Sequence, residues 1–164
     1  MNTGQKLKVT TTSSEESLAL GAAIAKYIRP GQLIEFVGDL GGGKTTAIKG
    51  LAKGLGITKT ITSPTFNIQR SYQLPGGNSL EHFDLYRLEN DKIILNELEE
   101  VLNYGKSIVV VEWAKNFHHR LKNDRLIIDL HFVDENIRDI EISAIGDLSK
   151  KVLDKINYDL SDKN

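Results

Sequence analysis

One short segment of the chain has the residue types and spacing of a phosphate-binding loop. Residues 38–45 read Gly-Asp-Leu-Gly-Gly-Gly-Lys-Thr and fill every fixed position of the P-loop pattern G-x-x-x-x-G-K-[ST]. Glycines allow backbone N–H groups to converge on phosphate oxygens, Lys44 supplies a positive charge, and the Thr45 hydroxyl can ligate magnesium. The segment predicts a nucleoside triphosphate site; the alternative is a glycine-rich connection that carries a lysine by chance.

The elements expected around this loop position it as the chemistry requires. A short, mostly apolar run at residues 33–37 directly precedes the loop, and apolar residues recur at helical spacing directly after it, up to Gly56. Strand, loop and helix therefore follow one another in the order of a P-loop, which disfavours the chance alternative.

A P-loop site also needs a second acidic group near the magnesium, usually at the end of a buried strand. Glu112 directly follows a β-branched run at residues 108–111, which is typical of a strand covered on both faces. The alternatives are that Glu112 only caps the strand, or that Asp84 is the magnesium ligand. His82, Asp84 and Tyr86 share one face of a strand by period two, which fits a cleft and a solvated surface about equally.

Two further segments give weaker signals. Residues 63–65 read Ser-Pro-Thr in an expected loop, where a hydroxyl near the γ-phosphate is often found in nucleotide-responsive segments. A basic stretch could cover a phosphate as a lid, although a solvated loop is the favoured interpretation. The basic residues are His118, His119, Arg120, Lys122 and Arg125.

The rest of the pattern alternates between helix and strand. Ser13 and Glu16 have the spacing of a helix capping box, and a Pro-Gly pair at residues 30–31 stops that first helix. The expected strands cover residues 7–12, 33–37, 66–72, 79–85, 108–111, 126–132 and 140–144, and the later helices cover residues 47–56, 94–102 and 148–160.

These elements predict the fold class. We expect a single α/β domain over residues 1–164, of the P-loop NTPase type, with a central mixed sheet and helices on both faces. Residues 66–72 should pair with 79–85, and 126–132 with 140–144, as antiparallel hairpins. The polar tail from about residue 159 is expected to fray.

Composition narrows the class of protein. The 21 basic and 22 acidic residues nearly balance, so the chain lacks the charge of a protein that binds nucleic acid unaided. There is no cysteine, no apolar run near the length of a membrane span and no N-terminal leader pattern. We expect a soluble, cytoplasmic protein without a membrane partner, and any nucleic-acid role should be indirect.

The residues of these motifs are more specific than the general P-loop pattern requires. Four segments occur in order: Gly-Asp-Leu-Gly-Gly-Gly-Lys-Thr-Thr at 38–46, Ser-Pro-Thr-Phe at 63–66, His-Phe-Asp-Leu-Tyr-Arg-Leu at 82–88 and Val-Glu-Trp at 111–113. Together they resemble the TsaE (YjeE) family of bacterial ATPases, which assist threonylcarbamoyladenosine formation in tRNA. The resemblance implies ATP and Mg²⁺ as ligands, a TsaD–TsaB complex as partner, contact with tRNA only through that complex, and slow hydrolysis that the partners stimulate.

The resemblance also implies roles for individual residues. It assigns Thr45 and Glu112 to magnesium and makes Asp84 the essential acid. Together with the P-loop chemistry and the loop at 63–65, it gives Asp84, Lys44 and Thr65 as the catalytic group. Less specific matches place Thr12, Ser14 and Arg138 near the base. The phosphate contacts would come from Asp39, Leu40, Gly41, Gly42, Gly43, Lys44, Thr45 and Thr46.

The chain departs from the family pattern in three places. Gly42 stands where alanine is common, and we expect it to be tolerated because glycine only loosens the loop. Residues 96–103 lack an expected glycine, and the linker after Trp113 is not rich in proline.

Two alternative functions remain at this point. One is a small-metabolite kinase in which Arg120, Lys122 and Arg125 form a lid, and the other is a module that binds ATP without hydrolysing it. A GTPase is disfavoured because the chain contains no Asn-Lys-x-Asp segment that could read guanine.

Overall fold

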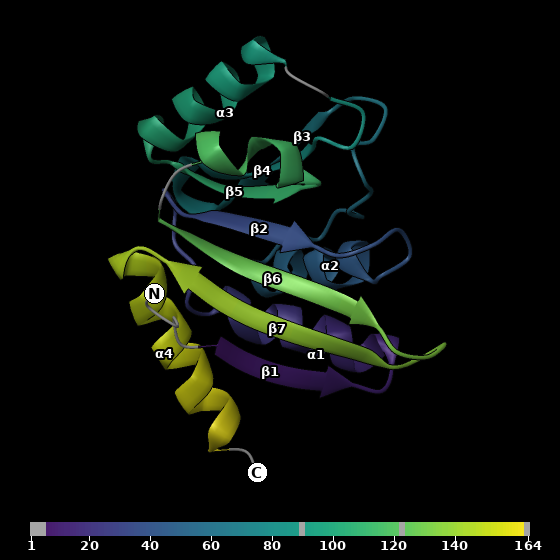
Figure 1. The fold of residues 1–164 in the computed structure, drawn as a ribbon. Helices are drawn as coiled ribbons and strands as arrows, with labels where there is room; N and C mark the ends of the chain where they lie inside the picture. Colours follow the sequence, from purple (N-terminus) through teal and green to yellow (C-terminus); the bar gives the residue numbers. More distant parts are fainter. Residues whose placement is uncertain (1–5, 89–90, 122–123, 163–164) are drawn as a thin grey trace.

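One seven-stranded sheet organises the chain, and the computed structural model describes residues 6–88, 91–121 and 124–162 (Figure 1). The strands lie in the order β1-β7-β6-β2-β5-β4-β3. β2, β4, β5 and β6 are parallel, whereas β1, β3 and β7 run antiparallel to the strands they pair with. The bounds are β1 (Lys6–Thr11), β2 (Leu33–Val37), β3 (Gln69–Leu74), β4 (Asn78–Asp84), β5 (Ser107–Glu112), β6 (Arg125–Phe132) and β7 (Arg138–Ile145).

Helices cover both faces of the sheet, as predicted. α1 (Ser14–Ala25), α2 (Lys44–Gly54) and α4 (Asp147–Ser161) share one apolar cluster with the sheet face that carries Ile34 and Val110. α3 (Lys92–Tyr104) and the short 3₁₀ helix η2 (Ala114–Arg120) pack on the opposite face, around Val109 and Val111. A second 3₁₀ turn, η1 (Pro75–Gly77), connects β3 to β4. The predicted α/β domain with a mixed sheet and two antiparallel hairpins is therefore confirmed.

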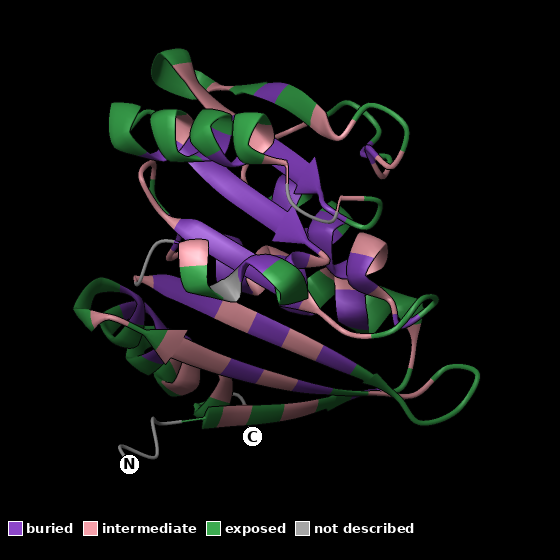
Figure 2. Ribbon diagram, turned by 45° about the horizontal axis from the view of Figure 1, so that its top comes forward, coloured by how far each residue is buried: buried purple, intermediate pink, exposed green. Residues whose placement is uncertain are grey.

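Burial differs between β5 and the pair β6 and β7, which lie on opposite sides of β2 in the sheet (Figure 2). Every residue of β5 is buried, which confirms the prediction that its β-branched run is covered on both faces. β6 and β7 instead alternate between buried and more exposed residues, because helices pack on only one of their faces.

The first helix begins where the capping pattern predicts. The Ser13 Oγ accepts a hydrogen bond of 3.1 Å from the backbone N–H of Glu16. The Glu16 carboxylate does not complete the box on Ser13; it accepts from the N–H of Thr12 at 2.7 Å. This contact fixes the connection from β1 into α1.

Glycines bring α1 and α2 unusually close together. A Cβ atom on Gly50 would lie 2.2 Å from the carbonyl oxygen of Leu18, and one on Gly21 would lie 2.3 Å from that of Ala47. On Gly54 it would lie 2.6 Å from the Cβ of Ala25. Because these backbones approach to within the space of a missing side chain, α1 sets the position of α2 and of the P-loop that precedes it.

Several predicted bounds were wrong by a few residues. β3 begins at Gln69 and not at residue 66, because the N–H groups of Asn67 and Ile68 both donate to the Pro64 carbonyl and Ile68 takes a φ of 62°. α2 ends at Gly54, and α4 is helical to Ser161, beyond the point from which fraying was expected. Among the described helices, none has the length and apolar character needed to cross a membrane.

Candidate functional site

The P-loop lies at the carboxyl end of β2 and leads directly into α2. Gly38, Gly41 and Gly43 have φ angles of 128°, 76° and 97°, which favour glycine. The Gly42 N–H donates to the Asp39 carbonyl at 3.0 Å and closes a turn within the loop. Since the first N–H groups of a helix have no intrahelical partner, the amino end of α2 and this loop form an anion-binding concavity.

Lys44 is buried within this loop. Its Nζ donates to the carbonyl oxygens of Gly38 at 2.7 Å and Asp39 at 2.8 Å, and it lies 4.1 Å from the ring centroid of Trp113. Burial lowers the pKa of Lys44, although the carboxylates of Glu112, Asp39 and Asp84 act in the opposite direction. A positive charge is thus held in the loop by dipoles and an aromatic face.

Three hydrogen bonds hold the Asp84 carboxylate. Its Oδ2 accepts from the Thr65 hydroxyl at 2.7 Å and the Ser63 hydroxyl at 3.0 Å, and its Oδ1 accepts from the Tyr86 N–H at 3.0 Å. Asp84 and His82 are both buried, so the interpretation of their strand face as a solvated surface was wrong. Tyr86 lies beyond β4 and is exposed, with its ring 4.9 Å from that of Trp113.

Glu112 ends the neighbouring strand at the same edge of the sheet. The parallel register of β4 and β5 places Glu112 beside Asp84. The Oε1 of Glu112 lies 2.7 Å from the Nε2 of His82, and both side chains are buried. Sequence reasoning placed His82 near the site but missed this contact, because no local pattern links two residues on different strands.

One cavity of about 400 Å³ joins these residues. Residues 40–46 of the P-loop form one wall. The structure thereby brings together all the residues predicted to be catalytic and both predicted magnesium ligands. The opposite wall consists of Ser63, Thr65, Asp84, Tyr86, Glu112 and Trp113.

The residues expected near the base are only partly assembled. Ser14, Thr46 and Arg138 line a small hollow beside Gly43. The Nε of Arg138 donates to the Gly42 carbonyl at 3.2 Å, so this side chain also supports the P-loop. Thr12 lines neither cavity, since its N–H and its hydroxyl both donate to Glu16.

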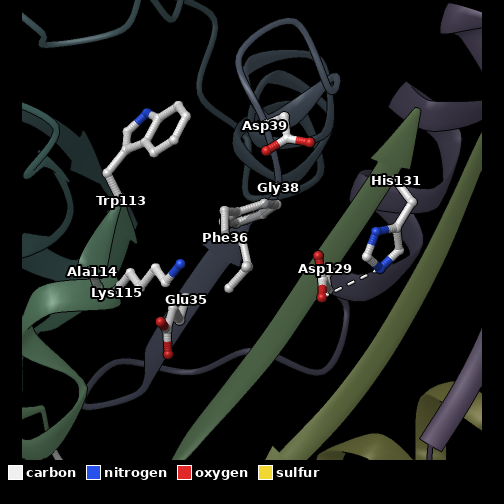
Figure 3. A pocket seen from close by; sticks show the side chains of 10 residues that line it. Glu35, Phe36, Gly38, Asp39, Trp113, Ala114, Lys115, Asp129 and His131 are labelled. Atoms are coloured by element: carbon white, nitrogen blue, oxygen red, sulfur yellow. Dashed lines mark ion pairs between the residues drawn. The ribbon is translucent and has the colours of Figure 1, made fainter.

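A second cavity, of about 440 Å³, was not foreseen (Figure 3). It lies between β2, β6 and η2, on the face of the sheet that η2 covers. Asp39 and Trp113 border it. In Figure 3 the Lys115 side chain extends toward Glu35, and Asp129 lies 3.3 Å from His131. Trp113 borders both cavities.

The basic stretch, for which the sequence favours a solvated loop over a lid, does not form one unit. The Nε of Arg125 lies 2.9 Å from the Oε2 of Glu35, and both side chains are buried. Arg125 begins β6, which runs parallel to β2, so it lies at the sheet edge opposite the P-loop. Lys122 and the side chain of His118 lie outside the described residues.

The space around Gly42 also differs from expectation. A Cβ atom there would lie 2.9 Å from the Asp39 carbonyl oxygen and 3.4 Å from that of Leu130. Glycine does more than loosen the loop at this position, because alanine would require the Asp39 peptide to shift.

Comparisons with known proteins identify relatives of the chain and a solved structure with a similar fold. Residues 11–140 match the family model described as "Threonylcarbamoyl adenosine biosynthesis protein TsaE". The "tRNA threonylcarbamoyladenosine biosynthesis protein TsaE" of Bacillus subtilis is 35% identical, over 93% of this chain and 95% of that protein. The protein with the same description from a Nostoc species is 36% identical, over 89% and 91%. The crystal structure of Bacillus subtilis YdiB superposes with a TM-score of 0.82 at 31% identity, covering 96% and 98% of the two chains.

Proposed function

The chain belongs to the TsaE family of tRNA threonylcarbamoyladenosine biosynthesis, and we propose that it acts there as a Mg²⁺-dependent ATPase working on a TsaD–TsaB complex. The observation that carries this proposal is the single cavity in which the P-loop, Lys44, Asp84 and Glu112 meet. Such a combination supports phosphoryl transfer, in which the protein contributes position and charge.

The residues present fit a nucleotide with a magnesium ion. Loop N–H groups and the Lys44 ammonium are donors for phosphate oxygens, and Ser14 and Arg138 lie on the side where the base would extend. The Thr45 hydroxyl and the Glu112 carboxylate are oxygen ligands of the kind that Mg²⁺ prefers. When bound, Mg²⁺ would neutralise charge on the β- and γ-phosphates.

The protein residues then divide the chemistry between them. Lys44 exchanges its bonds to the carbonyls of Gly38 and Asp39 for phosphate oxygens. Asp84 orients a water that attacks the γ-phosphorus and accepts its proton, while the bond from that phosphorus to the β–γ bridging oxygen breaks. The products are ADP and inorganic phosphate.

The loop that carries Ser63 and Thr65 couples this chemistry to a partner. Both hydroxyls donate to Asp84, so a change at Asp84 or at the γ-phosphate alters the position of the loop. Beside it, the side chains of Leu40, Phe66 and Tyr86 are 81%, 86% and 55% exposed. Exposed apolar groups around a nucleotide cavity support docking of a protein there. Hydrolysis would change the fit to TsaD–TsaB and allow another cycle.

The alternatives have less support. Arg125 is buried at the far edge of the sheet, which removes one residue of the lid that the kinase alternative needs. A module that binds ATP without hydrolysing it would not need Asp84 beside the phosphate site. Any arginine finger comes from Arg87, whose guanidinium lies 5.0 Å from the Phe66 ring centroid, or from the partner.

The deciding experiment is ATP hydrolysis by the purified chain, alone and with TsaD and TsaB. We expect slow turnover alone and a rise with the partners that Lys44→Ala abolishes. Asp84→Asn should lower the stimulated rate by at least about 100-fold while nucleotide still binds. Hydrolysis that ignores the partners, or full stimulated activity of Asp84→Asn, would contradict the proposal.

A further inference from the structure

His82 and Glu112 form a buried pair beneath the nucleotide cavity. The exposed fractions of their side chains are 0% and 3%, and the Nε2 of His82 lies 2.7 Å from the Oε1 of Glu112. In the register of β4 and β5, His82 lies beside Val110, and Asp84 lies beside Glu112. The Glu112 side chain therefore reaches diagonally back across the strands to the imidazole.

The chemistry of the contact fixes which nitrogen of the imidazole donates. A carboxylate oxygen accepts, so Nε2 carries a hydrogen and Nδ1 of the neutral ring is left with a lone pair. Within the part of the chain that the structure describes, the buried Nδ1 has no hydrogen-bond partner. An unsatisfied buried acceptor costs free energy that an apolar side chain would avoid. Packing alone therefore does not account for a histidine here.

The two acids of the cavity are held differently. Asp84 accepts hydrogen bonds from Ser63 and Thr65 of a loop and from a backbone N–H. Glu112 is held by an imidazole that is itself enclosed in the sheet. His82 lies on β4, which is paired on both sides by other strands, so it cannot move as a loop hydroxyl can. The Glu112 carboxylate therefore keeps one orientation whatever the loop does.

We infer that His82 is the positioning residue of the magnesium site. It holds Oε1 of Glu112 and leaves Oε2 as the oxygen that is presented to the cavity. This inference rests on the proposed function, because it assumes that Glu112 serves the metal. His82 does not touch the nucleotide in this arrangement; it acts only through Glu112, as outer partners of metal ligands do.

The test measures Mg²⁺ binding to the full chain in the presence of ADP. Trp113 is the chain's only tryptophan and lines the cavity beside Glu112, so its fluorescence reports both nucleotide and metal. His82→Leu should weaken Mg²⁺ affinity about tenfold or more, while ADP affinity in EDTA changes by less than about twofold. His82→Gln keeps an N–H near the position of Nε2 and should recover Mg²⁺ affinity to within about threefold.

A double-mutant cycle separates positioning from a general structural role. In the Glu112→Ala background, His82→Leu should weaken Mg²⁺ affinity by less than about twofold, because the carboxylate that His82 holds is absent. An equal loss in both backgrounds would overturn the inference. Should His82→Leu fail to fold by circular dichroism, His82→Asn replaces it, since the shorter amide corresponds to Nδ1 and does not reach Glu112.

The outcomes also separate this inference from the proposed function. If Glu112→Ala leaves Mg²⁺ affinity unchanged, Glu112 is not a metal ligand and that part of the proposed function fails. If Glu112→Ala weakens Mg²⁺ binding and His82→Leu or His82→Asn does not, only the positioning role of His82 fails.

Discussion

The charged residues that line the cavity beside the P-loop are buried, whereas those at the β1–β7 edge of the sheet are more exposed. Around the P-loop, Lys44, Asp84 and Glu112 are buried and are hydrogen-bonded to other protein groups. At the β1–β7 edge, Lys6 and Glu141 make an ion pair of 2.7 Å, but the Lys6 side chain is 55% exposed. Buried charges are expensive without exact partners, whereas exposed pairs contribute little. We therefore expect the P-loop side, with its fixed arrangement of charges, to tolerate fewer substitutions than the β1–β7 edge.

The backbone shows the same contrast. Near the P-loop the chain uses left-handed glycines and the close approach of α1 to α2. At the other edge, β1 pairs with β7 in an unbroken antiparallel register from Lys6 opposite Ser143 to Thr11 opposite Arg138. A regular ladder accepts many side chains, but a close backbone contact accepts few. Substitutions of equal size should thus have unequal effects on the two sides.

The largest effect should come from Gly50 in α2. In Gly50→Ala the new Cβ would lie 2.2 Å from the Leu18 carbonyl oxygen, so α1 and α2 must separate. We expect the free energy of unfolding to fall by about 3 kcal/mol, measured by urea denaturation. Gly56→Ala is the control, because its Cβ meets nothing within 4 Å and only the φ of 88° opposes it; it should lose about 1 kcal/mol. Similar losses in both variants would show that the helix contact is not tight.

Lys44→Met should separate binding from stability. Hydrogen bonds to a charged group contribute roughly 1.5–3 kcal/mol, so ADP affinity should fall about 30-fold. The free energy of unfolding should stay the same or rise, because a partly desolvated charge is removed from the fold. Titration calorimetry and denaturation measure the two effects. Lys115→Met, an exposed lysine of η2, is the control and should keep ADP affinity. Strong ADP binding by Lys44→Met would mean that the phosphates lie elsewhere.

The elements and the P-loop could be predicted because their signals are local. The strand at residues 108–111 and the motif at 38–45 each lie within a few consecutive residues. The α1–α2 contact could not, because Gly50 and Gly54 are poor helix formers whose value depends on Leu18 and Ala25 of another helix. A glycine in a helical pattern does not say which backbone approaches it.

The candidate site also has one part that the sequence predicts and one part that only the fold reveals. The motifs predicted Asp84 and Glu112 as the acidic residues of the site, but the hydrogen-bond partners of these two acids depend on the fold. The bonds from Ser63 and Thr65 to Asp84 connect a loop to a distant strand, and the turn at Ile68 that makes them possible was predicted as strand. The burial of Arg125 against Glu35 was also hidden, because a basic stretch in sequence resembles a solvated loop.

ADP affinity should depend on pH through Lys44. It should fall by about tenfold per pH unit above the lowered pKa of this residue. Burial lowers the pKa of Lys44, so the free protein loses this proton below the ordinary value of 10.5. Phosphate binding favours the charged lysine, and ADP affinity should therefore fall as the pH rises through the lowered pKa. The free energy of unfolding should rise over the same window, since the unfolded chain then holds more protons. Lys44→Met should abolish the alkaline fall in ADP affinity, and an unchanged profile would contradict this role of Lys44.

Glu141→Gln should have the smallest effect. The hydrogen bond from Lys6 lowers the pKa of Glu141, so the pair contributes stability above the ordinary pKa of 4.5 and loses it as the pH falls through the lowered folded value. Because the pair is exposed, the loss at pH 7 should be only about 0.5 kcal/mol and should shrink in 1 M salt. Denaturation of Glu141→Gln at pH 7 and pH 3 checks this, with Glu99→Gln on α3 as the control. A loss above about 2 kcal/mol would be too large for an exposed pair. It would show that the β1–β7 edge and the P-loop side do not differ in how much their charged residues contribute.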